Sequence, residues 1–201
     1  MANMWDERYA SDDYFYGKEP NDYLKAQAAQ LAPRSKVLCL AEGEGRNAVY
    51  LATLGHEVTA MDNSTAGLAK TRQLATERGV QVRTVKANLR TYQIPTNQYQ
   101  AIVAIFMHLP PDLQQQVFPQ IAPALTPGGL FIGEFYRPEQ LAYKTGGPPD
   151  EDLLYSPKLL AQWLPQLHFE QLEAVERNVV EGKGHTGLAA TVQVRARKSS
   201  S

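Results

Sequence analysis

The chain has 201 residues, 43% of them hydrophobic, and its 20 Lys and Arg residues nearly balance 21 Asp and Glu residues. That length suits one compact domain, and the hydrophobic fraction is too high for a disordered chain. A net charge of -1 argues against a nucleic-acid partner or an anionic membrane surface, and no apolar run approaches the length of a membrane span.

The cysteine content and the N-terminal residues predict a cytoplasmic location. Cys39 is the only cysteine, so it cannot form a disulfide within the chain, and a lone thiol fits a reducing compartment. Residues 1–30 are acidic and aromatic and contain no apolar run, so they do not resemble a signal peptide. Because Cys39 lies inside an apolar segment, we expect it to be a buried small hydrophobe rather than a reactive thiol.

Short apolar segments alternate with helical patterns through the first two thirds of the chain. Strands are expected at 36–40, 57–62, 80–85, 101–106 and 130–135, with helices at 47–54, 64–78 and 112–125. This alternation predicts parallel strands joined by right-handed helical crossovers, with helices on both faces of the sheet.

The last third of the chain has a different pattern. A loop rich in Gly and Pro at 144–152 precedes a short helix at 156–164, and extended segments follow at 169–180 and 187–197. The residues between those segments are too few for a helical crossover, so the pair must form an antiparallel hairpin. The fold class is therefore α/β, a doubly wound and mostly parallel sheet with an antiparallel hairpin over about 166–197 at its edge.

A glycine-containing loop and an acid follow the first two strands. Ala41-Glu42-Gly43-Glu44-Gly45 ends the first strand, and Asp62 ends the second. In doubly wound sheets ligands bind at the carboxyl ends of the central strands, where glycines let a ligand approach the backbone and an acid binds the ribose hydroxyls. The pattern favours an adenosine-type ligand over the alternative that the glycines only form a tight turn.

The two carboxylates of this loop discriminate between adenosine ligands. Glu42 and Glu44 would repel the pyrophosphate of a dinucleotide unless they turned away, and the chain contains no Gly-Lys-Ser/Thr of the phosphate-binding type. S-adenosylmethionine carries a sulfonium cation and no phosphate. The loop therefore favours S-adenosylmethionine over a nicotinamide dinucleotide.

The glycine loop also carries a family resemblance. The stretch VLCLAEGEGRNAVYLA (37–52), together with VTAMD, LTPGG and the terminal hairpin, resembles class I S-adenosylmethionine-dependent methyltransferases, in particular tellurite-resistance and thiopurine-methyltransferase-like enzymes. Further matches are Trp5-Asp6-x-Arg8-Tyr9, Tyr16-Gly17, Pro20-Asn21, the stretch 145–148, and Glu181-Gly182 with His185. The resemblance implies a Rossmann-like domain over 1–201 with a seven-stranded mixed sheet.

The same resemblance assigns parts of the chain to the cofactor. It implies that residues 36–136 bind S-adenosylmethionine, which leaves as S-adenosylhomocysteine, and that residues 1–30 form an aromatic lid or helix segment. The implied cofactor-binding residues are Ala41, Glu42, Gly43, Gly45, Asn47, Asp62, Asn63, Asn88, Leu89 and Phe106.

Three positions depart from the family pattern. Cys39 replaces the usual acid of the first strand, Ala41 replaces the first glycine, and Asn88 stands where an Asp near the adenine is usual. An amide can still bond to an exocyclic amine, so Asn88 remains a candidate. We expect Glu42 or an N-terminal group to compensate for the missing acid.

Methyl transfer requires alignment more than acid-base help, so neither a catalytic triad nor a metal site is predicted. His108, after the fourth strand, is a candidate base or substrate ligand, but it fits a histidine that satisfies loop backbone equally well. His185 is a second candidate, against an exposed turn histidine, and Tyr16 is the preferred lid residue. For Arg46 and Arg137 we expect, respectively, a brace on the glycine loop through a carboxylate and a solvated loop charge.

The leading hypothesis is methyl transfer from S-adenosylmethionine to a small molecule, with a soft or thiol-like nucleophile as the candidate acceptor. The cofactor fold consumes nearly the whole chain, which leaves no separate domain for recognising a macromolecule, and the oligomeric state stays open. The alternatives are a catalytically silent S-adenosylmethionine-binding or interaction protein, and a nicotinamide-dependent oxidoreductase.

Overall fold

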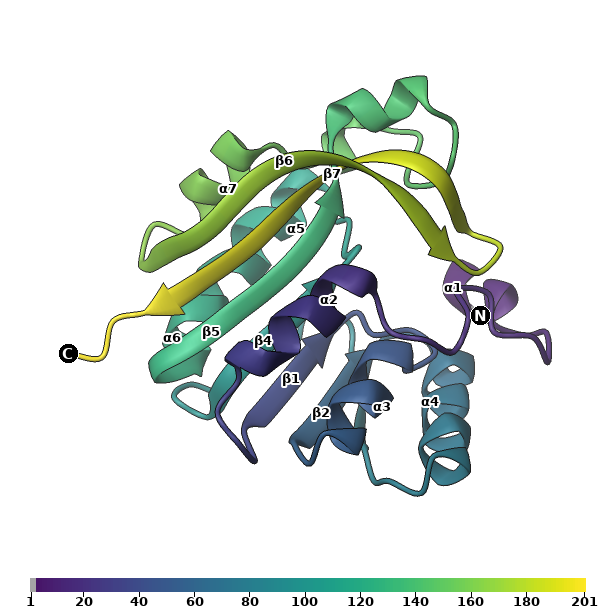
Figure 1. Cartoon of the computed structure of the whole chain (residues 1–201), viewed down its shortest axis with the longest axis horizontal. Helices are drawn as coiled ribbons and strands as arrows, with labels where there is room; N and C mark the ends of the chain where they lie inside the picture. Colours follow the sequence, from purple (N-terminus) through teal and green to yellow (C-terminus); the bar gives the residue numbers. More distant parts are fainter. Residues whose placement is uncertain (1–2) are drawn as a thin grey trace.

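A seven-stranded sheet forms the centre of the computed structural model, which describes residues 3–201 (Figure 1). Its strands are β1 (Lys36–Leu40), β2 (Glu57–Asp62), β3 (Arg83–Lys86), β4 (Tyr99–Ile105), β5 (Leu125–Tyr136), β6 (Leu167–Glu181) and β7 (His185–Lys198). Their order is β3-β2-β1-β4-β5-β7-β6; the first five run parallel, and β7 is antiparallel to both β5 and β6. The predicted mixed sheet with a hairpin edge is thereby confirmed.

Helices cover both faces of this sheet because its central strands are apolar on both sides. The α-helices are α1 (Met4–Arg8), α2 (Asp22–Gln27), α3 (Arg46–Thr53), α4 (Thr65–Glu77), α5 (Pro111–Val117), α6 (Ile121–Ala124) and α7 (Pro157–Trp163). In β1, Leu38 and Leu40 pack into the cluster under α5, α6 and α7, whereas Val37 and Cys39 pack under α2 and α3. Cys39 is buried as expected.

The structure differs from the sequence prediction in two places, the helix expected at 112–125 and the start of the third strand. The expected helix at 112–125 is divided into α5, a 3-10 turn at 118–120 and α6, since Pro119 and Pro123 lack the N–H groups that a continuous helix needs. The third strand begins at Arg83 rather than residue 80, because Val80 and Val82 pack into apolar clusters without joining the ladder.

An N-terminal segment, residues 4–18, crosses the carboxyl edge of the sheet; we call it the strap. Phe15 N–H donates to Glu44 of the glycine loop (2.8 Å), and the Phe15 carbonyl accepts from Lys183 N–H in the hairpin turn (2.8 Å). A Cβ on Gly182 would collide with that carbonyl, so only glycine fits there. The strap thus joins the glycine loop to the β6–β7 hairpin, as the proximity of α1 to the hairpin turn in Figure 1 illustrates.

Within residues 3–201, no helix has both the length and the apolar character that crossing a bilayer demands.

Candidate active site

Asp62 and the glycine loop meet at the carboxyl ends of β1 and β2. Gly43 N–H donates to Asp62 Oδ2 and Ser64 N–H donates to Asp62 Oδ1, each at 2.8 Å. Asp62 is buried, and burial raises the pKa of its carboxyl group. Since each carboxylate oxygen has two lone pairs, the fixed carboxylate can accept further hydrogen bonds from two neighbouring hydroxyls.

Both loop carboxylates are bonded to groups of the protein, which corrects the electrostatic expectation. Glu42 Oε1 accepts hydrogen bonds from the N–H groups of Asn47 (3.0 Å) and Ala48 (2.8 Å) in the first turn of α3. Burial raises the pKa of the Glu42 carboxyl to about 7. Glu44 bonds to Lys70 Nζ (2.7 Å) and to the strap. The loop therefore disfavours a pyrophosphate by filling the helix terminus that would bind it, rather than by attracting a sulfonium.

Two residues at the ends of neighbouring strands have left-handed backbone. Ala41, directly after β1, has φ 49°, and Phe106, directly after β4, has φ 52°. A left-handed conformation costs a residue with a Cβ roughly 1–2 kcal/mol, and such strain gathers at functional sites. At position 41 the alanine thus occupies a backbone conformation that suits the glycine of the family pattern.

We predict that Ala41→Gly raises the free energy of unfolding by about 1 kcal/mol, because glycine removes the left-handed penalty. Urea denaturation measures the change. Ala60→Gly is the matched control, since Ala60 is buried inside β2 and glycine weakens a strand interior. Equal destabilisation by both substitutions would contradict the assignment of strain to Ala41.

Among the remaining polar residues that the sequence assigned to the cofactor, Asn47 is held by the protein, whereas Asn63 and Asn88 are exposed. Asn47 Oδ1 accepts from the N–H of Asn21 (2.9 Å). Asn63 is exposed beside Asp62, and Asn88 is exposed after β3, where its Oδ1 accepts from Arg90 N–H (2.9 Å). The Asn88 amide nitrogen makes no side-chain hydrogen bond to the described residues, which leaves a donor at this edge.

The apolar candidates and the last loop glycine pack closely. Leu89 is partly buried against the core cluster under α5, and Gly45 is buried at the start of α3 against Thr71 of α4. A Cβ on Gly43 would lie 2.8 Å from the hydroxyl of Tyr9, which is buried. The strap therefore covers the glycine loop with the Tyr9 ring.

His185 lies inside an aromatic cluster rather than on an exposed turn. Its ring centroid is 4.6 Å from that of Tyr16, 4.7 Å from Phe106 and 5.0 Å from Tyr136. Burial, together with the nearby charge of Arg46, lowers the pKa of His185 to about 2, so the imidazole is neutral. The structure thus brings Tyr16, His185 and Phe106 together and excludes the alternative of a solvated histidine.

His108 is held by backbone on both sides of its ring. Nδ1 lies 2.6 Å from the Leu153 carbonyl, and Nε2 accepts from the N–H of Tyr136 at 3.2 Å. A neutral ring protonated at Nδ1 satisfies both bonds and has no lone pair free to remove a proton. The geometry therefore favours the alternative interpretation, a histidine that satisfies loop backbone.

His108 should make stability dependent on pH. Burial lowers its pKa from the ordinary 6.5 to about 4, so on acidification the unfolded chain binds a proton before the folded one does. The stabilising contribution of neutral His108 is complete above pH 6.5, the ordinary pKa of histidine. It is lost as the pH falls from there to about 4. The stability difference between wild type and His108→Gln should shrink by about 2–3 kcal/mol from about pH 7 to about pH 4.

Urea denaturation across that pH range measures the difference. Glu42 titrates in both proteins, so its contribution cancels in the stability difference. The same change at the exposed His168 is the matched control. A difference that stays constant with pH would show that His108 carries no proton-linked stability.

Several contacts that the sequence did not reveal connect the hairpin to the cofactor side. Arg46 Nη1 lies 3.1 Å from Glu181 Oε1, so the predicted brace exists but joins the hairpin rather than a carboxylate of the glycine loop. The Asn21 amide nitrogen donates to Glu134 and Glu181, each at 2.8 Å. Asn21 and Glu181 are 160 residues apart in the sequence. The only indication of Asn21 in the sequence was its place after Pro20, at the start of α2.

Arg137, on the rim of this region, has a structural role. Arg137 was expected to be solvated, yet its guanidinium donates to the carbonyls of Thr191 (2.8 Å) and Val175 (3.2 Å), which ties β5 to the hairpin.

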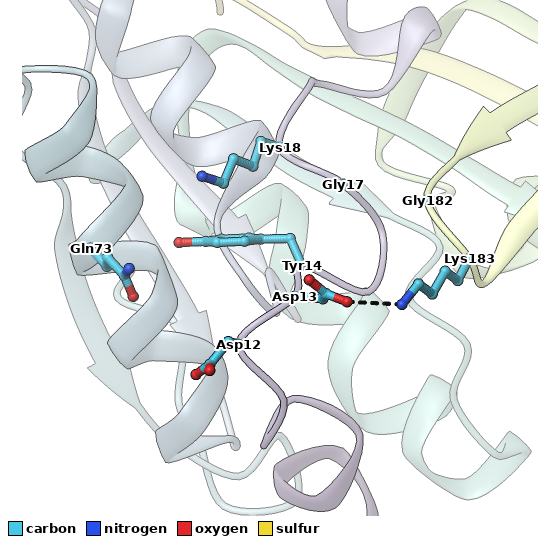
Figure 2. A pocket seen from close by; sticks show the side chains of 8 residues that line it. All are labelled: Asp12, Asp13, Tyr14, Gly17, Lys18, Gln73, Gly182 and Lys183. Atoms are coloured by element: carbon cyan, nitrogen blue, oxygen red, sulfur yellow. Dashed lines mark hydrogen bonds and ion pairs between the residues drawn. The ribbon is translucent and has the colours of Figure 1, made fainter.

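Figure 2 shows a groove of about 520 Å³ between the strap, α4 and the hairpin turn, with Asp13 bonded to Lys183 across it. Its lining residues are Asp12, Asp13, Tyr14, Gly17, Lys18, Gln73, Gly182 and Lys183. None of them lies at the ends of β1, β2 or β4.

Comparisons with known proteins agree with this geometry. Residues 37–129 match the family model described as a methyltransferase domain. The uncharacterized methyltransferase YbaJ of Bacillus subtilis (strain 168) is 29% identical over 111 residues, which is 55% of this chain and 44% of YbaJ. The chain therefore spans less than half the length of this curated relative.

Solved structures share the whole architecture at low identity. The protein in "Conversion of a Disulfide Bond into a Thioacetal Group during Echinomycin Biosynthesis" superposes with a TM-score of 0.79 at 18% identity, covering 100% of this chain and 92% of that one. TehB from Haemophilus influenzae gives 0.72 at 18% identity, covering 96% and 65%. The sheet order and these superpositions show a Rossmann-like methyltransferase fold, and the domain match over residues 37–129 agrees with it.

Proposed function

We propose that the chain transfers the methyl group of S-adenosylmethionine to a small, soft nucleophile such as a thiol. The observation that carries the proposal is the Asp62 carboxylate, fixed by Gly43 N–H and Ser64 N–H beside a helix terminus that Glu42 fills. This arrangement suits an adenosine cofactor that has ribose hydroxyls and no phosphate.

The residues of the site fit the cofactor in three places. Asp62 would accept hydrogen bonds from the ribose hydroxyls, and the free Asn88 amide would lie at the adenine edge. When bound, the cofactor supplies an activated methyl group on a positively charged sulfur. The ring faces of Tyr9 and Tyr16 in the strap, and of Phe106 after β4, suit such a cation and exclude water from it.

The acceptor must be able to attack without help from a histidine base. Both nitrogens of His108 are bonded to backbone, and His185, with its lowered pKa, is a very weak base. Burial also raises the pKa of Tyr136 well above its ordinary value. A thiolate or similar soft anion meets this condition, whereas a hydroxyl or a protonated amine needs its proton removed. A structural neighbour whose published description concerns a disulfide and a thioacetal also supports a sulfur acceptor.

Transfer of a tritiated methyl group from S-adenosylmethionine into a panel of thiols, chalcogen oxyanions, phenols and amines tests the proposal. We expect product with the soft acceptors, and we expect the pH dependence of the rate to follow the pKa of each thiol. Labelling of amines or phenols alone would contradict the soft-acceptor assignment.

The second candidate is an S-adenosylmethionine-binding protein without transfer. It is motivated by Cys39 in place of the family acid and by the strained Ala41. It predicts binding of S-adenosylhomocysteine together with no labelled product from the panel or from a fractionated metabolite extract.

A further inference from the structure

A short segment of glycine and proline, residues 146–149, covers the aromatic cluster from outside; we call it the flap. A Cβ on Gly147 would lie 2.8 Å from the ring of Tyr136, and a Cβ on Gly146 would lie 3.0 Å from the ring of His185. Gly147 is itself exposed, whereas the Tyr136 side chain is fully buried. The flap is therefore one residue thick at this point, with solvent on one side and the Tyr136 ring on the other.

The flap is held in place by the residues at its two ends. Before the flap, the Thr145 carbonyl accepts from Thr186 N–H (3.2 Å), and the Thr145 hydroxyl donates to the Leu188 carbonyl (2.6 Å). After the flap, Tyr155 N–H donates to the Tyr136 carbonyl (3.0 Å). Both ends are thus fixed to the last strands of the sheet.

Between these ends, the flap makes one hydrogen bond to the part of the chain that the structure describes. The Gln140 amide nitrogen donates to the Gly146 carbonyl at 3.0 Å. Pro148 and Pro149 have no N–H to donate, and Gly147 has no side chain to bury. A segment with so few bonds and buried contacts opens locally at a low cost in free energy.

The strap, which covers the glycine loop, is fastened much more firmly than the flap. Lys70 Nζ donates to the Asp13 carbonyl (2.6 Å) and to Glu44 (2.7 Å), and the Lys70 and Glu44 side chains are both buried. The backbone N–H and carbonyl of Phe15 are also bonded, to Glu44 and Lys183 respectively. Opening the strap would break these bonds and disturb a buried ion pair. The flap is therefore the weaker of the two covers.

Beneath the flap, stacked rings lead to the position proposed for the methyl group. The ring centroids of Tyr136 and Phe106 are 4.6 Å apart, with 15° between the ring planes. Phe106 follows β4 directly and is one of the rings proposed to face the sulfonium. Aromatic faces of this kind suit an apolar group carried by a soft nucleophile.

We propose that the methyl acceptor enters through the flap and takes the place that Gly147 holds against the Tyr136 ring. The flap itself vacates the space, so the closed structure needs no cavity there. The class of acceptor that fits is a thiol with a small apolar substituent, because aromatic rings line this place. Gly147 then determines specificity, since the flap yields only as far as its two fixed ends allow. The inference rests on the proposed function.

Chemical modification of Phe106→Cys tests the route without catalysis. Cys39 is fully buried, so the thiol introduced by this substitution is the one that reacts with methyl methanethiosulfonate. Adding Gly147→Ala should displace the flap outward, because the new Cβ meets a fully buried Tyr136 ring that cannot yield. We expect the modification, followed by mass spectrometry, to become about 10-fold faster.

Two further glycine substitutions serve as comparisons in the same Phe106→Cys chain. Gly182→Ala displaces the strap instead, since its Cβ would collide with the Phe15 carbonyl. Gly55→Ala is the matched control, because its φ of 90° is close to the 83° of Gly147 and nothing lies within 4 Å of its Cβ. Neither should accelerate the modification. Acceleration by Gly182→Ala alone, or equal rates in all the variants, would overturn the proposal.

A second measurement keeps Phe106 and uses methyl transfer to ethanethiol and cyclohexanethiol, two alkyl thiols of similar acidity and different size. Gly147→Ala should raise kcat/KM for cyclohexanethiol relative to ethanethiol about 10-fold, because a displaced flap admits the larger group. Gly55→Ala should leave this ratio unchanged. A ratio that Gly147→Ala leaves unchanged or lowers would also overturn the proposal. Transfer to neither thiol by the wild-type chain would count against the proposed function, while the cysteine modification still decides the route.

Discussion

Replacing Asp62 with alanine is expected to weaken the binding of S-adenosylhomocysteine at least about 100-fold. Two hydroxyl hydrogen bonds to a buried carboxylate are lost, and each bond to a charged group contributes on the order of 1.5–3 kcal/mol. The substitution also leaves Gly43 N–H and Ser64 N–H without acceptors, so a lower thermal midpoint is expected as well. Calorimetry and thermal unfolding measure the two effects separately.

Asp62→Asn separates affinity from folding. An amide keeps one acceptor oxygen for the backbone, so this variant should recover much of the stability and only part of the affinity. Asp112→Ala, which removes a surface pair with Arg90, should alter neither quantity. Wild-type affinity in Asp62→Ala would show that the ribose does not bind at the end of β2.

Glu134→Leu is expected to lower the free energy of unfolding by about 3–5 kcal/mol. Glu134 is fully buried, and the change leaves the Arg177 guanidinium without its buried partner. Burial alone would raise the pKa of Glu134, but the hydrogen bonds and charge of Arg177 outweigh it and hold that pKa below its ordinary value. The carboxylate is therefore ionised at neutral pH and needs its donors.

Urea denaturation of Glu134→Leu, Arg177→Met and the double variant measures this coupling. The double variant should be more stable than the sum of the single changes implies, because it leaves no isolated buried charge. Glu170→Gln, at the outer strand, should cost no more than about 1 kcal/mol. Additive losses would show that the two groups are not an energetic pair.

The parts of the fold set by local pattern could be predicted from sequence. Continuous apolar runs predicted strands buried on both faces, and the short turn at 181–186 predicted the hairpin. The division of the helix at 112–125 could have been anticipated too, since Pro119 and Pro123 remove N–H donors. The start of β3 could not, because apolar alternation at Val80 and Val82 does not distinguish ladder pairing from packing alone.

The candidate site was predictable in position but not in contacts. Strand ends located Asp62 and the glycine loop, because ligand sites follow the topology of parallel sheets. The direction of Glu42 depended on the free N–H groups of α3, and the burial of His185 depended on Tyr16 and Phe106, which are distant in sequence. Such contacts follow from tertiary packing, which no short motif encodes.

Calorimetric titration of the wild-type chain with S-adenosylhomocysteine and, separately, with NAD tests the assignment of the cofactor most directly. Because Glu42 fills the helix terminus and Asp62 remains available to a ribose, we expect one S-adenosylhomocysteine to bind per chain with micromolar affinity and NAD not to bind below millimolar concentration. Tight binding of NAD, or no binding of S-adenosylhomocysteine below millimolar concentration, would contradict it.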